Sequence, residues 1–305
     1  MQSTFTTFRL PGPFARRRGP SNSALAFDPA SLFANGEQGA VYDPSDLSTL
    51  FQDDGGTTPV TEPGQTVGLK LDKRLGLELG PEEVTNGDFS DGGAGWIDSP
   101  FLEYSNNRLI FLGESSAIAV RREESFGPGF VEWEIEIAQR TSGSYRVRFE
   151  AEGSTVTDTA STASVGIHRG ISYLPSSIDT LTVVATSGPE GEVERVSVRE
   201  LPGNHATQPT AESRPVYQAG NGLHWLVDDG VDDSLTATVP DLGADATLWY
   251  ATEAGATILT GQTIGAGDLE VLRGDNTFSF GAIDRALTAT ETTQLQTYLE
   301  EQSGV

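Results

Sequence analysis

The feature that most constrains the fold is a strict alternation of apolar and polar residues over 131–137 (VEWEIEI) and 144–150 (SYRVRFE). Period two is the mark of a strand with one buried and one solvated face. Residues 141–143 (Thr-Ser-Gly) have the chemistry of a three-residue hairpin loop, which would pair Ile137 with Val147. The sequence therefore predicts a β-hairpin over 131–150.

Further strand patterns follow the same period, separated by polar turns and without helical segments. They lie at 108–113, 116–122, 179–186 and 191–201. The 35 glycines and 16 prolines favour turns over helices. With 305 residues, the chain is long enough for two domains or for one domain and a long arm. We therefore expect an all-β protein, with a β-sandwich after about residue 82.

Charge and composition exclude several classes of function. A net charge of −25 argues against nucleic acid or an anionic membrane as partner, because phosphate binding needs clustered Lys and Arg. Solubility is the simpler explanation of this acidity. The chain has no cysteine, which excludes disulfides, thiolate catalysis and Cys-ligated metals. No segment approaches the ~20 apolar residues of a membrane span, and we expect no Sec export signal.

The N-terminal part carries the only basic segment, with Arg9, Arg16, Arg17 and Arg18 and no acid before residue 28. Such a segment suits an acidic partner surface, and a disordered tail is the alternative. Asp28-Pro29 and Asp43-Pro44 then open two short helices. Their apolar residues need a partner surface, because isolated helices this short are unstable. These residues are Leu32, Phe33, Leu50 and Phe51. We expect residues 1–81 to form an extended docking arm.

The C-terminus has the signature of a capped helix. Thr288 and Glu291 form a capping box, Leu295 and Leu299 share an apolar stripe with Tyr298, and Gly304 ends the segment.

Three motifs together resemble a known family. An opening VTNGDFS (84–90), then Gly95-Trp96, and a closing strand EVERVSVRE (192–200) are similar to the jelly-roll, carbohydrate-binding-module-like domains of bacteriophage and prophage virion proteins. The resemblance implies that residues 84–89 form a first strand beside the last strand, 191–201. Family members often hold a structural calcium there through an acid after the Phe and another in the last strand. Here Ser90 follows Phe89, and Glu194 is the only suitably placed acid in the closing strand, which leaves calcium open. The resemblance implies no other cofactor.

The flanking segments resemble other phage modules. Residues 203–237 and 280–304 are similar to the opening and closing parts of concanavalin-like (laminin-G-like) sandwiches, and residues 36–82 to a leader of such modules. The short stretch between the two parts implies a reduced domain. We therefore expect an arm at 1–81, a jelly roll at 82–202 and a reduced concanavalin-like module at 203–305.

Catalytic motifs are missing from the sequence. GxSxG, Walker, GxGxxG and HExxH patterns do not occur, and the three histidines are isolated. Glu132, Glu134 and Glu136 alternate along one strand, so we interpret them as a solvated face beside Arg146 and Arg148 rather than as glycosidase acids. The acids of residues 228–233 are interpreted as an acidic turn, and we predict no metal site.

Sugar binding normally uses an exposed aromatic ring flanked by polar groups. The candidates in the jelly roll are Trp96, Tyr173 and Tyr104. Tyr145 shares the inferred buried face of its strand and is a weaker candidate.

Together these expectations describe a non-enzymatic phage virion protein of the tail fibre or baseplate, which displays a glycan-binding domain for host attachment. A head-decoration protein without glycan binding and a polysaccharide depolymerase are the alternatives. The expected partners are other virion proteins through the arm, further copies in a homotrimer, and host polysaccharide. The expected location is the virion, assembled in the host cytoplasm.

Overall fold

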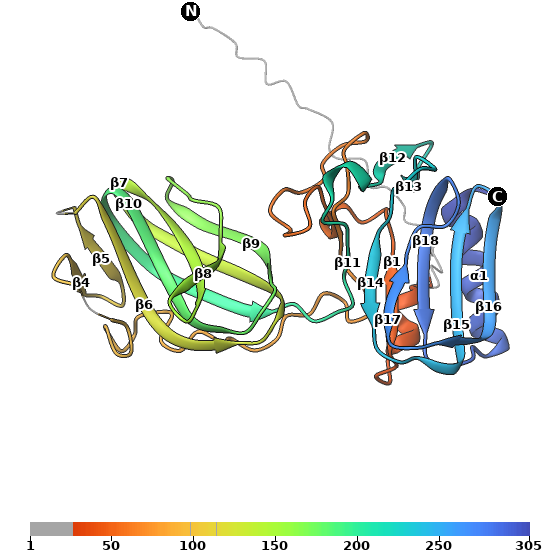
Figure 1. Ribbon diagram of the computed structural model, residues 1–305, viewed down its shortest axis with the longest axis horizontal. Helices are drawn as coiled ribbons and strands as arrows, with labels where there is room; N and C mark the ends of the chain where they lie inside the picture. The colour runs from red at the N-terminus through yellow and green to blue at the C-terminus, as the bar shows by residue number, and fades with distance from the viewer. Residues whose placement is uncertain (1–26, 98, 114) are drawn as a thin grey trace, which may run out of the picture.

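Two β-rich domains lie side by side along the long axis of the molecule (Figure 1) in the computed structural model, which describes residues 27–97, 99–113 and 115–305. The first domain holds β4 (Leu102–Tyr104), β5 (Leu109–Leu112), β6 (Ala117–Phe126), β7 (Gly129–Ala151), β8 (Ser154–Asp158), β9 (Gly166–Leu174) and β10 (Ile178–Glu200). The expected all-β class is confirmed.

The second domain is built from both ends of the described chain. Its N-terminal elements are η1 (Pro29–Phe33), β1 (Gly39–Tyr42), η2 (Leu47–Thr49), β2 (Leu50–Phe51) and β3 (Leu69–Lys70). Its C-terminal elements are β11 (Ala206–Thr207), η3 (Ala211–Ser213), β12 (Val216–Gly220), β13 (Leu223–Val227), β14 (Thr236–Val239), β15 (Gly243–Thr252), β16 (Gly255–Ile264), β17 (Gly267–Glu270), β18 (Asn276–Ile283) and α1 (Ala289–Ser303). The first domain is therefore an insertion in the second.

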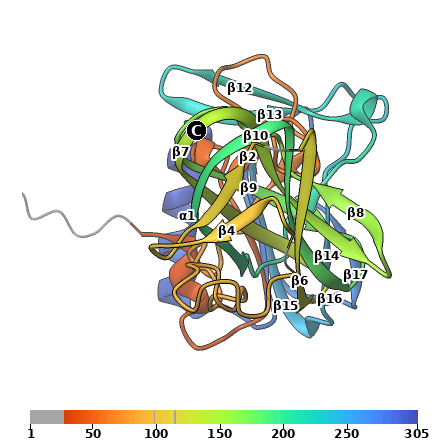
Figure 2. The same cartoon turned by 90° about the vertical axis from the view of Figure 1, so that its left-hand side faces the viewer.

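Two long antiparallel strands, β7 and β10, organise the first domain, and Figure 2 shows them curving together across it. The predicted hairpin over 131–150 is wrong, because both of its arms belong to β7 and pair with β10: Ile137 lies opposite Val193, and Val147 opposite Val183. The chain bends at Gly143, where φ is +88° and a side chain would meet Pro189 at 2.6 Å. Glycine here makes a corner between layers instead of a hairpin loop.

The bend gives the first domain two layers around one core. The N-terminal half of β7 pairs with β9 and with the C-terminal half of β10, which also pairs with β5. The C-terminal half of β7 pairs with β8 and with the N-terminal half of β10, which also pairs with β6. Apolar residues of both halves meet inside, as in the edge-to-face contact of Phe111 and Tyr145 at 5.3 Å. This is the expected β-sandwich.

Residues 84–96 close one end of this sandwich as a series of turns rather than as the expected first strand. Asn86 and Phe89 have positive φ, which a strand does not allow. The segment nevertheless lies beside β10, because Val196 donates its N–H to the Gly87 carbonyl at 2.8 Å.

The second domain has two sheets, and the N-terminal residues contribute strands to both. In the six-stranded sheet, β1 pairs with β18, with Gly39 opposite Ile283. In the five-stranded sheet, the order is β17-β14-β11-β3-β2. The extended arm expected for residues 1–81 is therefore wrong for residues 39–70, which form one domain together with residues of the C-terminal part.

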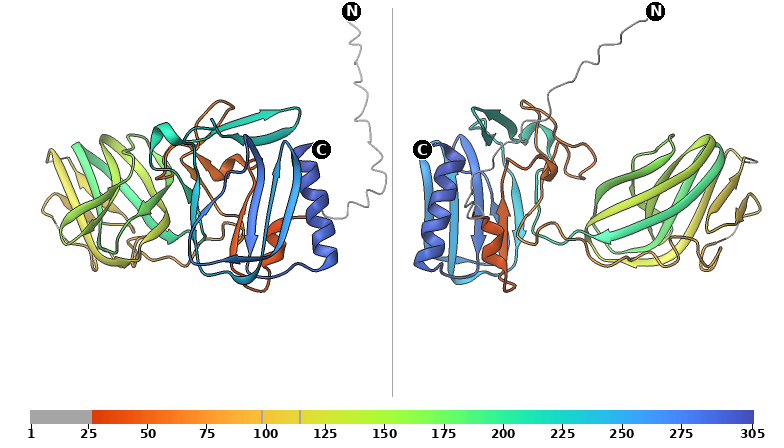
Figure 3. Two further views of the ribbon diagram at one scale, coloured as in Figure 1. Left: turned by 45° about the vertical axis from the view of Figure 1, so that its right-hand side comes forward. Right: turned by 180° about the vertical axis from the view of Figure 1, so that it is seen from behind.

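Three layers result, and Figure 3 shows their order: α1, the six-stranded sheet, then the five-stranded sheet. The alternation of β1 explains its place, since Val41 packs toward α1 while Ala40 and Tyr42 face the other sheet. A side chain at Gly281 would meet the Trp249 ring at 2.2 Å, so glycine is required for this close approach.

The C-terminal helix forms as predicted. The Thr288 hydroxyl accepts from the Glu291 N–H at 3.2 Å, the Glu291 carboxylate accepts from the Thr288 N–H at 2.7 Å, and Gly304 is left-handed. Leu295 and Leu299 are fully buried against the sheet. Among the helices of the described residues, none has the length and hydropathy to cross a bilayer.

An apolar cluster and two chain crossings join the domains. Phe130, Ile171 and Leu201 of the first domain pack with Phe51, Leu69 and Leu71 of the second domain. The crossings, residues 71–83 outward and 201–205 back, run side by side in Figure 1.

Candidate functional site

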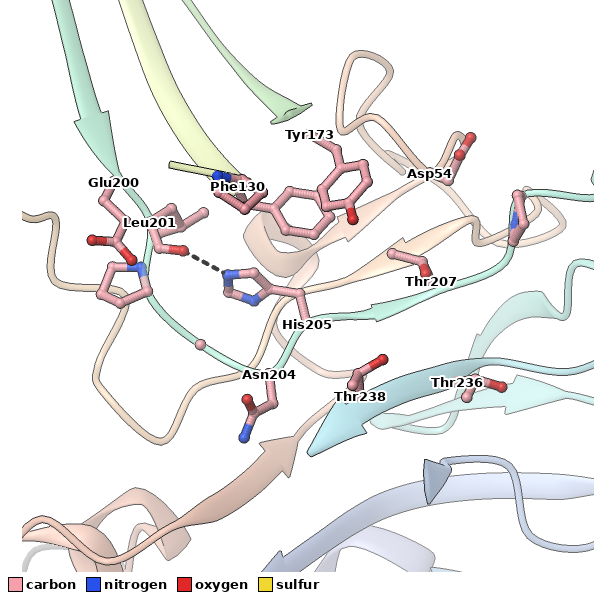
Figure 4. Close-up of a pocket in the computed structure, with 15 residues that line it drawn as sticks. Asp54, Phe130, Tyr173, Glu200, Leu201, Asn204, His205, Thr207, Thr236 and Thr238 are labelled. Atoms are coloured by element: carbon pink, nitrogen blue, oxygen red, sulfur yellow. Dashed lines mark hydrogen bonds between the residues drawn. The ribbon is translucent and has the colours of Figure 1, made fainter. Parts of the chain in front are cut away.

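The candidate site is a cleft of about 410 Å³ between the two domains, beside the apolar cluster (Figure 4). The ends of β7, β9 and β10 form one wall, and β11, β14 and the loop that carries Asp54 form the other. Residues 201–205, which connect the domains, form its floor.

An aromatic pair forms the wall that belongs to the first domain. Phe130 on β7 lies directly opposite Tyr173 on β9, and their ring centroids are 5.0 Å apart. Phe130 is 9% exposed and packs into the interdomain cluster, whereas Tyr173 is 46% exposed. The buried ring therefore supports an exposed one, and Figure 4 shows Tyr173 extending toward the side where Thr207 and Asp54 lie.

Hydroxyl groups line the opposite wall. Thr236 and Thr238 stand on the outward face of β14, because the alternating Ala237 and Val239 are buried in the core. Their hydroxyls donate to carboxylates of the neighbouring strand β17: Thr236 to Glu270 at 3.3 Å and Thr238 to Asp268 at 3.2 Å. Each hydroxyl oxygen thus keeps acceptor capacity toward the cleft.

His205 fixes the floor and the joint between the domains. Its Nδ1 accepts from the Asp72 backbone N–H at 3.0 Å, and its Nε2 lies 3.0 Å from the Leu201 carbonyl, to which it donates. Burial lowers the pKa of His205 to about 4, so the ring is neutral at neutral pH. The Phe130 ring meets it edge-on at 5.0 Å. Both ring nitrogens of His205 are therefore paired, and its ring links the two crossings.

Asp72 binds the backbone of the returning crossing, residues 201–205. Its carboxylate is fully buried and accepts from the backbone N–H groups of Val41 at 2.9 Å, Arg74 at 2.9 Å and Asn204 at 3.0 Å. Burial raises the pKa of Asp72, and the backbone hydrogen bonds oppose that rise. One carboxylate thus connects β1, the outgoing crossing and the returning crossing.

Of the three predicted platform aromatics, the structure places only Tyr173 in this cleft. Trp96 is a core residue, 5% exposed, with its ring 5.4 Å from Phe89 and its N–H bound to the Asn86 carbonyl at 3.1 Å. Tyr104 packs on Phe89 at 6.2 Å. The prediction of Trp96 as an exposed platform is wrong, because the turns of 86–95 fold its ring inward.

The predicted docking residues divide in two groups. Leu32, Phe33, Leu50 and Phe51 are at most 9% exposed and pack inside this chain, so their prediction as a docking surface is wrong. Their apolar side chains find partners in the second domain itself. Arg9, Arg16, Arg17 and Arg18 lie outside the described residues.

The glutamates of β7 have other partners than expected. Glu134 is 4% exposed and forms hydrogen-bonded ion pairs with Arg169 of β9 and Arg195 of β10. Burial alone would raise the pKa of Glu134, but the bonds from Arg195 and Arg169 hold it below its usual value. Arg148 pairs instead with Asp158, at 2.7 Å. A carboxylate locked between two guanidinium groups is a structural ion pair rather than a catalytic acid.

Two places in the described residues bear on metal ligation. At the calcium position that the resemblance implies, Glu194 of the closing strand pairs with Arg108 at 3.0 Å. The acids Asp228, Asp229 and Asp233 gather within 4.8 Å, but they accept hydrogen bonds from backbone N–H groups of their own turn, as the acidic-turn interpretation implies.

Sequence reasoning missed most of the cleft. Phe130 follows Gly129 at the start of a strand, and Thr207, Thr236 and Thr238 are ordinary strand residues. The sequence predicted only Tyr173 of these residues, as an aromatic platform, and it predicted no strand at 166–174. Nothing in the sequence indicated that β9 and β14 would face each other.

Comparisons with known proteins leave the family open. No protein-family model and no curated protein matches the sequence. Among solved structures, the N-terminal CBM22-1-CBM22-2 tandem domain of Paenibacillus barcinonensis Xyn10C is 13% identical, with a TM-score of 0.26, over 71% of this chain and 95% of that one. A Paenibacillus xanthan lyase is 12% identical, with a TM-score of 0.23, over 76% of this chain and 26% of that one. Likenesses this low carry no argument about fold or function.

Proposed function

We propose that this chain is a non-enzymatic virion protein of a bacteriophage or prophage that attaches to a host-surface glycan through the interdomain cleft. The virion assignment rests on the resemblance of residues 84–96, 192–200, 203–237 and 280–304 to phage modules. The glycan assignment rests on the chemistry of the cleft.

The observation that carries the glycan assignment is the exposed ring of Tyr173, supported by Phe130 and facing a wall of hydroxyls. Sugars present apolar C–H faces, which stack on aromatic rings, and hydroxyl edges, which exchange hydrogen bonds with polar side chains. Both kinds of contact are offered here, one by each domain. The cleft can therefore hold a sugar residue between its walls.

The other parts of the proposal follow from this role. Anchoring to neighbouring virion proteins is assigned to the basic residues Arg9, Arg16, Arg17 and Arg18, because the apolar candidates belong to the core. A trimer suits a fibre, and the assembled virion is the proposed location. The charge of −25 disfavours nucleic acid and membrane as partners. We expect binding without turnover.

The glycan assignment is tested by binding of the full chain to an oligosaccharide array. Tyr173→Ala should weaken binding about tenfold or more, as expected when a central aromatic contact of ~1.4 kcal/mol or more is removed. Ile97→Ala is the matched control, because Ile97 is 55% exposed and does not line the cleft. Equal binding by the Tyr173 variant and the wild type would reject the cleft as the binding site.

The virion assignment is tested by immunogold labelling of purified particles with antibody to residues 82–305. Label at the tail would support host attachment. Label over the head would favour decoration, and particles without label would reject the virion assignment.

A further inference from the structure

We propose that the cleft selects uncharged sugar residues and rejects glycans that carry carboxylate, phosphate or sulfate groups. This inference rests on the proposed glycan binding and specifies its substrate class. It follows from the charges of the cleft and from the direction of its hydrogen bonds.

The cleft offers an anion no cationic partner. Of the described residues that line it, none is a lysine or arginine, and the one nitrogen base is His205. Both ring nitrogens of His205 are engaged, with Asp72 and Leu201, and the ring is neutral. Burying an anionic sugar here would remove water from its charge without replacing that hydration.

Two carboxylates add repulsion. Asp54 stands on the second-domain wall and Glu200 at the end of β10 on the other. Asp54 is paired with Arg214 at 3.1 Å. Glu200 has no ion pair within the described residues, and beside it the pKa of Glu83 is raised by burial and by the charge of Glu200. An incoming anion therefore meets a negative potential.

Several hydrogen-bond donors of the walls are already used. The Thr236 and Thr238 hydroxyls donate to Glu270 and Asp268, and the Asn204 amide donates to the Gly39 carbonyl at 2.7 Å. What the two threonine side chains still present is oxygen with acceptor capacity. Sugar hydroxyls can donate to such oxygens, whereas carboxylates, phosphates and sulfates at neutral pH are acceptors. The walls therefore match neutral sugars in hydrogen-bond direction as well as in charge.

The test uses the full chain and an array of neutral hexose, deoxyhexose and N-acetylhexosamine oligosaccharides beside uronate, sialate, sulfate and phosphate counterparts. We expect the anionic members to bind at least about tenfold more weakly than their neutral counterparts, since one unit-charge repulsion across a solvated cleft is worth about that factor. High salt should narrow the difference by screening.

Charge removal provides the second arm of the test. Glu200→Gln removes a carboxylate without releasing an arginine, and it should raise the ratio of anionic to neutral affinity several-fold. Asp54→Asn combined with it should raise the ratio further. Glu103→Gln is the matched control, because Glu103 is an exposed acid on β4 at the far end of the first domain, and its ratio should equal that of the wild type.

The outcomes separate the two proposals. Preferential or equal binding of anionic glycans, or an unchanged ratio in the Glu200 variant, would overturn the charge selectivity while leaving glycan binding in place. Failure to bind any glycan on the array would count against the proposed function itself.

Discussion

Residues 29–70 form part of the second domain, and this has a measurable consequence at Phe33. The side chain is 4% exposed, and its ring centroid lies 6.5 Å from that of Trp249, within the cluster that includes Leu295 and Leu299 of α1. Phe33→Ala would open a cavity between η1, the sheet and α1. An extended arm, by contrast, would tolerate the same substitution without loss of stability.

The expected cost follows from the burial. Truncating a fully buried phenylalanine to alanine removes its transfer free energy and leaves a cavity, together about 3–5 kcal/mol. Urea lowers the free energy of unfolding of a domain by ~1–3 kcal/mol per molar. The unfolding midpoint of the second domain should therefore fall by on the order of 1–5 M.

Hydrogen exchange mass spectrometry at increasing urea concentrations reports the two domains separately through their peptides. Phe33→Ala should destabilise peptides from β15, β18 and α1 and affect those from β7 and β10 less. Ile97→Ala, at a side chain that is 55% exposed, is the control and should change stability by less than about 0.5 kcal/mol. If β18 and α1 were as protected in the Phe33 variant as in the wild type, the packing of Phe33 in the core of the second domain would be refuted.

Two further predictions concern buried titratable groups. Because burial lowers the pKa of His205 from 6.5 to about 4, its neutral form contributes stability that is complete above pH 6.5 and is lost as the pH falls through 4. His205→Gln, whose amide can still accept from Asp72 and donate to Leu201, should lose less stability between pH 7 and pH 4 in urea titrations, and an equal loss would contradict this role. Arg195→Met leaves the Glu134 carboxylate with one arginine and should destabilise the first domain by about 1–3 kcal/mol. Restoration of stability in the double variant with Glu134→Leu would confirm that the unpaired charge is the cause, and a further loss would contradict it.

Local patterns predicted the strands between residues 108 and 150, those between 179 and 201, and the terminal helix, because these elements depend on neighbouring residues. The alternation at 131–150 identified β-structure correctly, and the Thr288 capping box identified the start of α1. The same alternation could not show whether Gly143 turns the chain back or bends it around a corner. That choice depends on β10, which begins at Ile178 and pairs with both arms.

Pairing between distant segments explains the larger errors. Gly39 of β1 pairs with Ile283 of β18, and no local pattern in β1 predicts pairing with a strand so distant in the sequence. The cleft was missed for the same reason, since its walls come from β7, β9, β11 and β14 and exist only because the first domain is inserted in the second. Trp96 was misplaced because turns have no periodicity that distinguishes a buried ring from an exposed one.

Binding of a neutral glycan between the domains is the central claim, and hydrogen exchange of the full chain with the tightest-binding neutral oligosaccharide of the array tests it most directly. The account predicts added protection at both walls, in the peptides that contain Phe130, Tyr173 and residues 204–207. Protection confined to other surfaces, with these three regions unchanged, would contradict it.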